Sequence, residues 1–119
     1  MTNYPEFYQQ LQSLVGTLGK EAAGTIGGFS RMHQAAVAAG ALDAKTKELM
    51  SLAIGIAVHC DGCIAYHVRD ALAAGASRAE IIETLGVAVM MGGGPGLMYA
   101  AQALEALDQY ERAAVPATS

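Results

Sequence analysis

The chain has 119 residues, of which 53% are hydrophobic and 15% charged, and its formal net charge is −4 at pH 7. This length fits one domain, because domains most often contain roughly 100–150 residues. An acidic chain without a cluster of Lys and Arg lacks the electrostatic footprint of a nucleic-acid-binding protein. So few charges cannot cover the surface of a monomer, and we expect a homo-oligomer that buries apolar faces between copies.

A series of helices is predicted, because breaks and caps recur while alternating β-branched runs are missing. Asn3 is expected to cap a first helix that ends near Gly19. A short helical turn follows and breaks at Gly27–Gly28, since each glycine weakens a helix by up to about 1 kcal/mol. The next helix is expected over residues 29–39, closed by Gly40.

The middle of the chain predicts two helices that meet at the cysteines. Asp43 is expected to cap a helix over residues 44–59, whose apolar circumference is typical of a core helix. Asp61 is the expected N-cap of the following helix, over residues 62–74. These elements would place the cysteine pair at the turn between the two helices.

The last part of the chain predicts two more helices, separated by glycines. Ser77 and Glu80 form a capping box that starts the first of them. The run GGGPG at residues 92–96 ends it, and a final helix is expected over residues 97–114. Residues 115–119 are expected to fray. The whole pattern predicts an all-α bundle of about six helices.

No exported or membrane-spanning segment is predicted. The start, MTNYPEFYQQL, has neither the basic end nor the apolar centre of a signal peptide. The most apolar run, LMSLAIGIAVHC, has about twelve residues, short of the ~20 that a membrane span needs. We therefore expect a cytoplasmic protein that contacts no membrane. In that reducing compartment, two nearby cysteines are more typical of a redox or metal site than of a structural disulfide.

The stretch HCDGCIAYHVRD, residues 59–70, holds both cysteines and two of the three histidines. With Asp61 as N-cap, Cys63 stands in the first helical turn, where free amides and the helix dipole lower the pKa of a thiol below its usual ~8.5. His67 lies one turn further on the same face and can take the thiol's proton. In a C-x-x-C pair one sulfur can attack and the other can close a disulfide. These features predict a redox site.

A zinc site is the alternative reading of the same residues. Cys60, Cys63 and His67 offer three ligands, and His59 or Glu48 would supply a fourth. Structural zinc modules usually bring a second ligand pair from a distant segment, and the chain has no further cysteine. A buried cysteine pair without chemistry is the third reading. The histidine one turn beyond the pair favours the redox reading over both.

Glu48 lies on the same helical stripe as Cys60. If the two helices were strictly antiparallel, Glu48 would lie about 18 Å from the turn and His67 about 10 Å from it. Direct contact between them would then need a crossing angle or a bridging water. In the other interpretation, Glu48 is a first-turn carboxylate that pairs with Lys45 or Arg69.

Glu48, Cys60, Cys63 and His67 together follow the spacing E-x11-C-x2-C-x3-H. This resembles the signature of the alkylhydroperoxidase D-like family, within the carboxymuconolactone decarboxylase superfamily. The segments KELMSLAIGIAVHCDGCIAYHVRDALAAGAS and AEIIETLGVAVMMGGGPGLMYAAQALEAL are similar to that family too. The resemblance implies one all-helical domain over residues 1–119, with a core at about 20–110, which assembles as homotrimers or homohexamers.

The resemblance also implies a thiol peroxidase or disulfide reductase that needs no cofactor or metal. Carried onto this chain, it makes Cys63 the thiolate that a hydroperoxide oxidises and Cys60 the thiol that closes the disulfide. His67 and Glu48 become the proton relay. The N-terminal cysteine of such a pair is often the exposed one, so the opposite order stays open. The implied partners are a hydroperoxide and a thiol reductant, either lipoyl-bearing or thioredoxin-like.

Two functions of other classes are alternatives to this one. A helical module could bind zinc or another ligand without turnover. An enzyme of the superfamily could also act on a small carbon substrate through His67 and Glu48, with the cysteines incidental.

Overall fold

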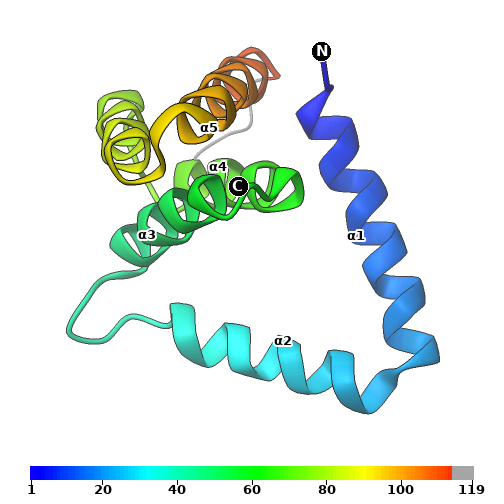
Figure 1. Cartoon of the computed structure of the whole chain (residues 1–119). Coiled ribbons are helices and arrows are strands. Elements are labelled where there is room, and N and C mark those ends of the chain that lie inside the picture. Colours follow the sequence, from blue (N-terminus) through cyan, green and yellow to red (C-terminus); the bar gives the residue numbers. More distant parts are fainter. Residues whose placement is uncertain (114–119) are drawn as a thin grey trace.

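The computed structural model describes residues 1–113, which are helical apart from short connections. Its helices are α1 (Tyr4–Glu21), α2 (Ala23–Val37), α3 (Ala44–Ala57), α4 (Asp61–Ala73) and α5 (Arg78–Arg112). Figure 1 shows α3, α4 and α5 packed together, while α1 and α2 extend away as two sides of an open frame. The predicted all-α class is confirmed. The expected fraying at residues 115–119 lies outside the described residues.

The first two helices differ from the prediction in where the chain breaks. α1 begins after Asn3, whose side chain accepts the Glu6 amide at 3.1 Å, so the predicted cap is confirmed. The break falls at Ala22, with φ −131° and ψ 59°, and α2 runs unbroken through Gly27–Gly28. The predicted break at that pair was wrong, because a cost of about 1 kcal/mol per glycine weakens a helix without ending it.

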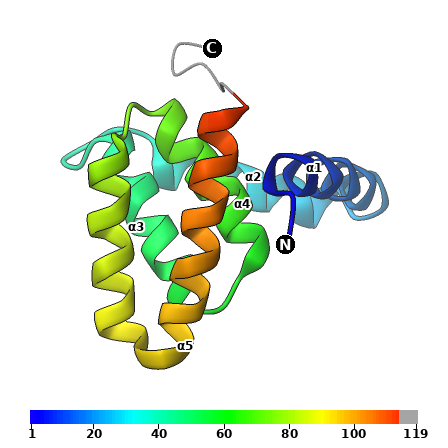
Figure 2. The ribbon, with the colours of Figure 1, turned by 90° about the horizontal axis from the view of Figure 1, so that it is seen from above.

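One bent helix, α5, replaces the last two predicted helices, so the structure has five helices where six were expected. The bend is at Gly93, whose φ of 65° and ψ of −150° suit glycine alone among the residues. Figure 2 shows the two halves of α5 side by side. At Gly96 an added Cβ would lie 3.2 Å from the Ala88 carbonyl oxygen, so glycine also permits this close approach. The predicted capping box at Ser77 and Glu80 is present.

By length and composition alone, α5 is long and apolar enough to cross a membrane. This was not predicted from the sequence, because only consecutive apolar residues were counted there. Only 22% of its most apolar window is buried. The bend at Gly93 nevertheless folds α5 back on itself, and both halves supply core residues. Arg78 at the start of α5 pairs with Asp108 at 2.7 Å near its end. These contacts are those of a packed helical hairpin.

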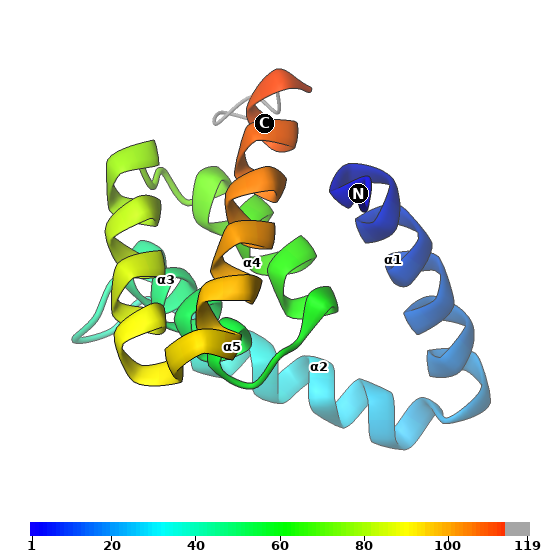
Figure 3. The ribbon, with the colours of Figure 1, turned by 45° about the horizontal axis from the view of Figure 1, so that its top comes forward.

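The hydrophobic core lies between α3, α4 and the two halves of α5 (Figure 3). The start of α1 joins it through Tyr4, whose backbone N–H donates to Gln109 Oε1 at 2.6 Å. The Tyr110 hydroxyl donates to the Ala65 carbonyl at 2.7 Å and ties α5 to α4. The largest fully buried aliphatic side chains are Leu52, Ile56, Ile64, Val68, Ile81 and Leu107. No residue of α2 is buried.

Candidate active site

A disulfide joins Cys60 and Cys63 at the start of α4. The N-cap of this helix is Cys60, whose Sγ accepts the backbone N–H of Cys63 at 3.1 Å. The predicted cap, Asp61, is instead the first helical residue. The shift arises because α3 ends at Ala57, and the chain then turns through His59, with φ 61°, into an extended Cys60. The field of the helix N-terminus therefore acts on the sulfur of Cys60.

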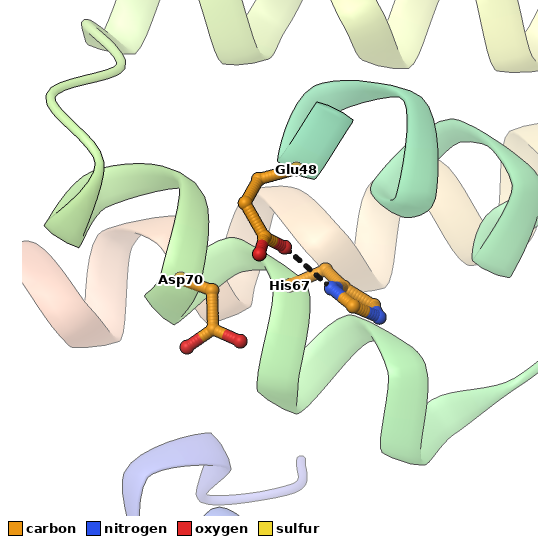
Figure 4. Close-up of side chains that lie close together, drawn as sticks. All are labelled: Glu48, His67 and Asp70. Carbon is orange, nitrogen blue, oxygen red and sulfur yellow. Dashed lines mark hydrogen bonds and ion pairs between the residues drawn. The ribbon is translucent and has the colours of Figure 1, made fainter. Parts of the chain in front are cut away.

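A direct hydrogen bond of 2.8 Å joins Glu48 Oε1 on α3 to His67 Nδ1 on α4 (Figure 4). Of the two ways that the sequence left open, a crossing angle or a bridging water, the water is not needed. Counted from the true helix ends, Glu48 lies about 14 Å from the end of α3 and His67 about 9 Å from the start of α4. The remaining ~5 Å is within the reach of the two side chains. The alternative partners Lys45 and Arg69 pair with Glu80 and Asp70 instead.

The Glu48–His67 pair is shielded from solvent. The two side chains are 9% and 17% exposed, respectively. An ionised Glu48 can only accept, so it holds a proton on His67 Nδ1, and in the neutral imidazole that tautomer leaves a lone pair on Nε2. His67 lines the same cavity as both cysteines. The imidazole is thus a base whose tautomer and orientation are fixed by a carboxylate.

Asp70 is a further member of the site that the sequence analysis did not single out. It stands one turn after His67 on α4, and polar atoms of Glu48, His67 and Asp70 all lie within 4.8 Å of one another (Figure 4). Burial raises the pKa of the Asp70 carboxyl, and the Glu48 carboxylate raises it further. Arg69 donates to Asp70 Oδ1 at 3.3 Å. The signal that could have found Asp70 is its i+3 spacing from His67.

The disulfide and His67 face a cavity of about 660 Å³ between α1, α2 and α4. Its apolar wall comes mainly from α1 and α2, which contribute Leu11, Val15, Leu18, Ile26 and Phe29. Polar groups that line it include the disulfide, His67 and Asp70 of α4, and His33 of α2. The volume lies in the range of small-molecule sites. The arm formed by α1 and α2 therefore serves as a wall of the site.

α3 and α4 approach each other closely beside the cysteines. A Cβ added to Gly55 on α3 would lie 2.7 Å from the Cβ of Cys63, nearer than side chains tolerate. On the other side, a Cβ on Gly62 would lie 3.2 Å from Leu11 Cδ1 of α1. Glycines on both sides thus let α3 and α1 close around the start of α4.

The zinc reading fits this arrangement less well than the redox reading does. A metal binds thiolates, and here both sulfurs are engaged in a disulfide. The ring of His59, one candidate for the fourth ligand, stacks on Tyr99 with ring centroids 4.8 Å apart. Among the described residues, those that could hold a metal ion together are Glu48, His67 and Asp70. This set includes Asp70, which the zinc interpretation had not named, and it does not include the cysteines.

Residues 26–106 match the Carboxymuconolactone decarboxylase family. The chain belongs to this family. The match covers α3, α4 and most of α2 and α5, and so includes Glu48, both cysteines, His67 and Asp70, while the α1 wall of the cavity lies outside it. The family resemblance inferred from the E-x11-C-x2-C-x3-H spacing is therefore confirmed.

Solved structures from this decarboxylase family share the fold. A family protein of Legionella pneumophila, solved in its apo form, is 44% identical and superposes with a TM-score of 0.86, over 90% of this chain and 96% of its own. A family protein of Thermotoga maritima, for which a part in an antioxidative response has been suggested, is 27% identical with a TM-score of 0.82, over 94% and 98%. An uncharacterized protein of Cupriavidus necator is 38% identical over 78% of this chain and 82% of its own.

Proposed function

We propose that this family member is a thiol-dependent peroxidase that reduces hydroperoxides through Cys60 and Cys63. The observation that carries the proposal is a disulfide at a helix N-terminus, facing the same cavity as an imidazole held by a buried carboxylate. A helix N-terminus and a neighbouring base are the two features that activate a thiol. The antioxidative role suggested for the Thermotoga maritima relative supports the same reading.

The proposed cycle has two halves, and each is balanced. The dithiol and a hydroperoxide give the disulfide, an alcohol and water, so two electrons pass from sulfur to the O–O bond. A dithiol reductant then exchanges with the disulfide and restores both thiols. His67 and Glu48 hold the proton that leaves one sulfur until a leaving oxygen takes it. The reductant is proposed to be lipoyl-bearing or thioredoxin-like, and the site of action the cytoplasm.

Steady-state consumption of an organic hydroperoxide with a dithiol such as dihydrolipoamide tests the proposal. We expect turnover by the parent and loss of turnover in both Cys60→Ser and Cys63→Ser, because each variant lacks one of the sulfurs of the disulfide. Glu83→Gln, on the exposed surface of α5, serves as the control and should keep the parental rate. A parent protein that consumes no peroxide under these conditions would contradict the proposal.

A second candidate function is proton-transfer chemistry on a small carbon substrate. Its support is the pairing of His67 with Glu48 and the decarboxylase name of the family. The two candidates separate in the variant that lacks both cysteines. An activity that survives in that variant would depend on His67 and Glu48 alone and would favour the second candidate.

A further inference from the structure

The turn between α3 and α4 holds a residue in a strained backbone conformation. Within residues 1–113, His59 is the one non-glycine residue with a positive φ, at 61°. A side chain with a Cβ disfavours this left-handed region, although histidine enters it more often than most residues do. The next residue is Cys60, the N-cap of α4 and one half of the disulfide. The strain therefore lies directly beside the cysteine pair.

The hydrogen bonds around His59 show why the chain adopts that conformation. The His59 N–H donates to the Ile56 carbonyl at 3.1 Å, and the Cys60 N–H donates to the Gly55 carbonyl at 2.9 Å. These two bonds are those of a Schellman motif, which ends a helix with a left-handed residue that is usually glycine. The end of α3 thus fixes the backbone of Cys60.

Cys60 belongs to the end of one helix and the start of the next. Its carbonyl accepts the Ile64 N–H at 3.1 Å, which is the first backbone bond of α4, and its Sγ accepts the Cys63 N–H at 3.1 Å. Gly55, whose carbonyl holds Cys60, also leaves the space beside the Cβ of Cys63. The conformation of His59 therefore sets the position of both cysteines relative to α3.

The side chain of His59 links this turn to the core. Its ring stacks on the ring of Tyr99, with centroids 4.8 Å apart and an angle of 10° between the planes. Tyr99 is half-buried in the second half of α5 and packs against the hydrophobic core. Figure 2 and Figure 3 show the turn passing beside this half of α5. A glycine at position 59 would suit the backbone but would have no ring to stack.

We propose that His59 is a positioning residue of the cysteine pair, and that its stack on Tyr99 keeps the two thiols arranged for disulfide formation. In the disulfide form, the S–S bond itself holds Cys60 and Cys63 together. In the dithiol form only the turn holds them, and without the stack His59 is free to leave the left-handed region. More conformations are then lost when the disulfide closes. The stack therefore favours the disulfide over the dithiol.

This role rests on the proposed function in one respect, namely that the pair cycles between dithiol and disulfide. Dithiothreitol opens the pair by thiol–disulfide exchange: the S–S bond breaks, two electrons and two protons pass to the cysteine sulfurs, and dithiothreitol closes its own ring disulfide. The folded protein is equilibrated with mixtures of reduced and oxidised dithiothreitol, quenched with acid and alkylated. Mass spectrometry then gives the exchange constant, and no hydroperoxide takes part.

Tyr99→Leu removes the stack and leaves the sequence of the turn unchanged. We expect its equilibrium to shift toward the dithiol by about fivefold, since a stacked aromatic pair changes an equilibrium constant by roughly two- to tenfold. Tyr99→Phe keeps the ring and should keep the parental constant. Arg78→Ala is the control for a general loss of stability, because it removes the ion pair with Asp108 within α5. This control should also keep the parental constant.

A variant in the turn gives an independent measurement. Asparagine also enters the left-handed region readily, so His59→Asn keeps the turn while it removes the ring. Because His59 is exposed, this variant should fold even if Tyr99→Leu does not. It should show the same shift as Tyr99→Leu, and the double variant should show no further shift, because both residues act through one contact.

Parental exchange constants in both Tyr99→Leu and His59→Asn would overturn the positioning role, and so would an equal shift in Arg78→Ala. Hydroperoxide consumption tests the proposed function separately. Shifted constants in a protein that consumes no hydroperoxide would uphold the positioning role and reject the peroxidase function. Parental constants in variants of a protein that does consume hydroperoxide would reject the positioning role alone.

Discussion

Among the described residues Glu48 is the one buried charged side chain, and its burial makes sense only with its partner. A charge taken out of water is costly unless it is paired and hydrogen-bonded. His67 provides that pairing at 2.8 Å and gains a fixed orientation in return. Removing either partner leaves the other side chain buried without its hydrogen-bond partner.

Glu48→Gln should slow peroxide reduction by roughly 100-fold, since a well-placed general acid–base contributes about 10²–10⁴ in rate. The amide keeps the size of the carboxylate but cannot hold a proton. The rate of disulfide formation after mixing with a hydroperoxide measures the effect. Glu83→Gln is the matched control on an exposed position. A Glu48→Gln protein within twofold of the parent would remove Glu48 from the relay.

Asp70→Asn should raise the free energy of unfolding at neutral pH. Burial and the nearby Glu48 raise the pKa of the Asp70 carboxyl in the folded state, so its ionised form is disfavoured by folding. The group stabilises the fold when protonated, and this contribution is lost as pH rises through the raised folded-state pKa. The gain from Asp70→Asn should therefore vanish below the ordinary carboxyl pKa of about 3.9. Urea unfolding at pH 7 and pH 3 measures it, and a variant less stable than the parent at pH 7 would contradict the account.

The residues of the candidate site were largely predictable from the sequence, because motif spacing preserves the identity of reactive residues. The spacing singles out Glu48, Cys60, Cys63 and His67, and the structure brings them to one site. Asp70 was not named, since an acidic residue at i+3 is common on any helix surface. The helix cap was misplaced by one residue, because both Cys60 and Asp61 offer a side chain that can accept an amide.

At the scale of the helices, glycines determine how closely the elements approach the site. Gly55 lets α3 pack against Cys63, and Gly93 turns α5 back on itself. The sequence predicted the second feature from the run GGGPG but gave no sign of the first, because a close contact between two helices depends on their crossing. It also predicted a break at Gly27–Gly28 where the helix continues.

Gly55→Ala should destabilise the protein and disturb the cysteine pair. Overpacking costs typically about 1–3 kcal/mol, against which alanine returns up to about 1 kcal/mol of helix propensity. Gly86→Ala on α5 is the control, because nothing lies within 4 Å of the added Cβ. Chemical denaturation should give Gly55→Ala a lower free energy of unfolding than the parent, and Gly86→Ala a higher one. A Gly55→Ala protein as stable as Gly86→Ala would show that α3 and α4 do not pack this closely.

Gly93→Ala should cost about 1–3 kcal/mol, because the backbone of Gly93 lies in a region that side chains with a Cβ avoid. Gly94→Ala, one residue later, has no positive φ and open space around its Cβ, so it should be close to neutral. Thermal unfolding followed by circular dichroism compares them. Equal melting temperatures would mean that α5 does not bend at Gly93.

At the scale of the whole molecule, the described surface carries many large apolar side chains. Phe29 and Met32 on α2 are each 60% exposed, and Met90 and Met91 beside the bend of α5 are 73% and 75% exposed. α2 buries no residue in the protomer, although short isolated helices are marginal in water. We propose that copies of the chain cover these faces in a homotrimer or homohexamer.

Sedimentation velocity should show that assembly, and Met90→Glu combined with Met91→Glu should shift it toward smaller species, because the added charges oppose burial of this face. Gln10→Glu on the exposed side of α1 is the control for added charge. A parent protein that sediments as a monomer at micromolar concentration would contradict the proposed assembly.

We propose above all that Cys60 and Cys63 act as a dithiol that reduces a hydroperoxide. Stopped-flow mixing of the reduced protein with an organic hydroperoxide, under single-turnover conditions and without a reductant, is the decisive experiment. We expect two thiols to be lost per chain, one alcohol to form, and the product to carry the Cys60–Cys63 disulfide. Thiols that persist while the hydroperoxide stays intact would contradict it.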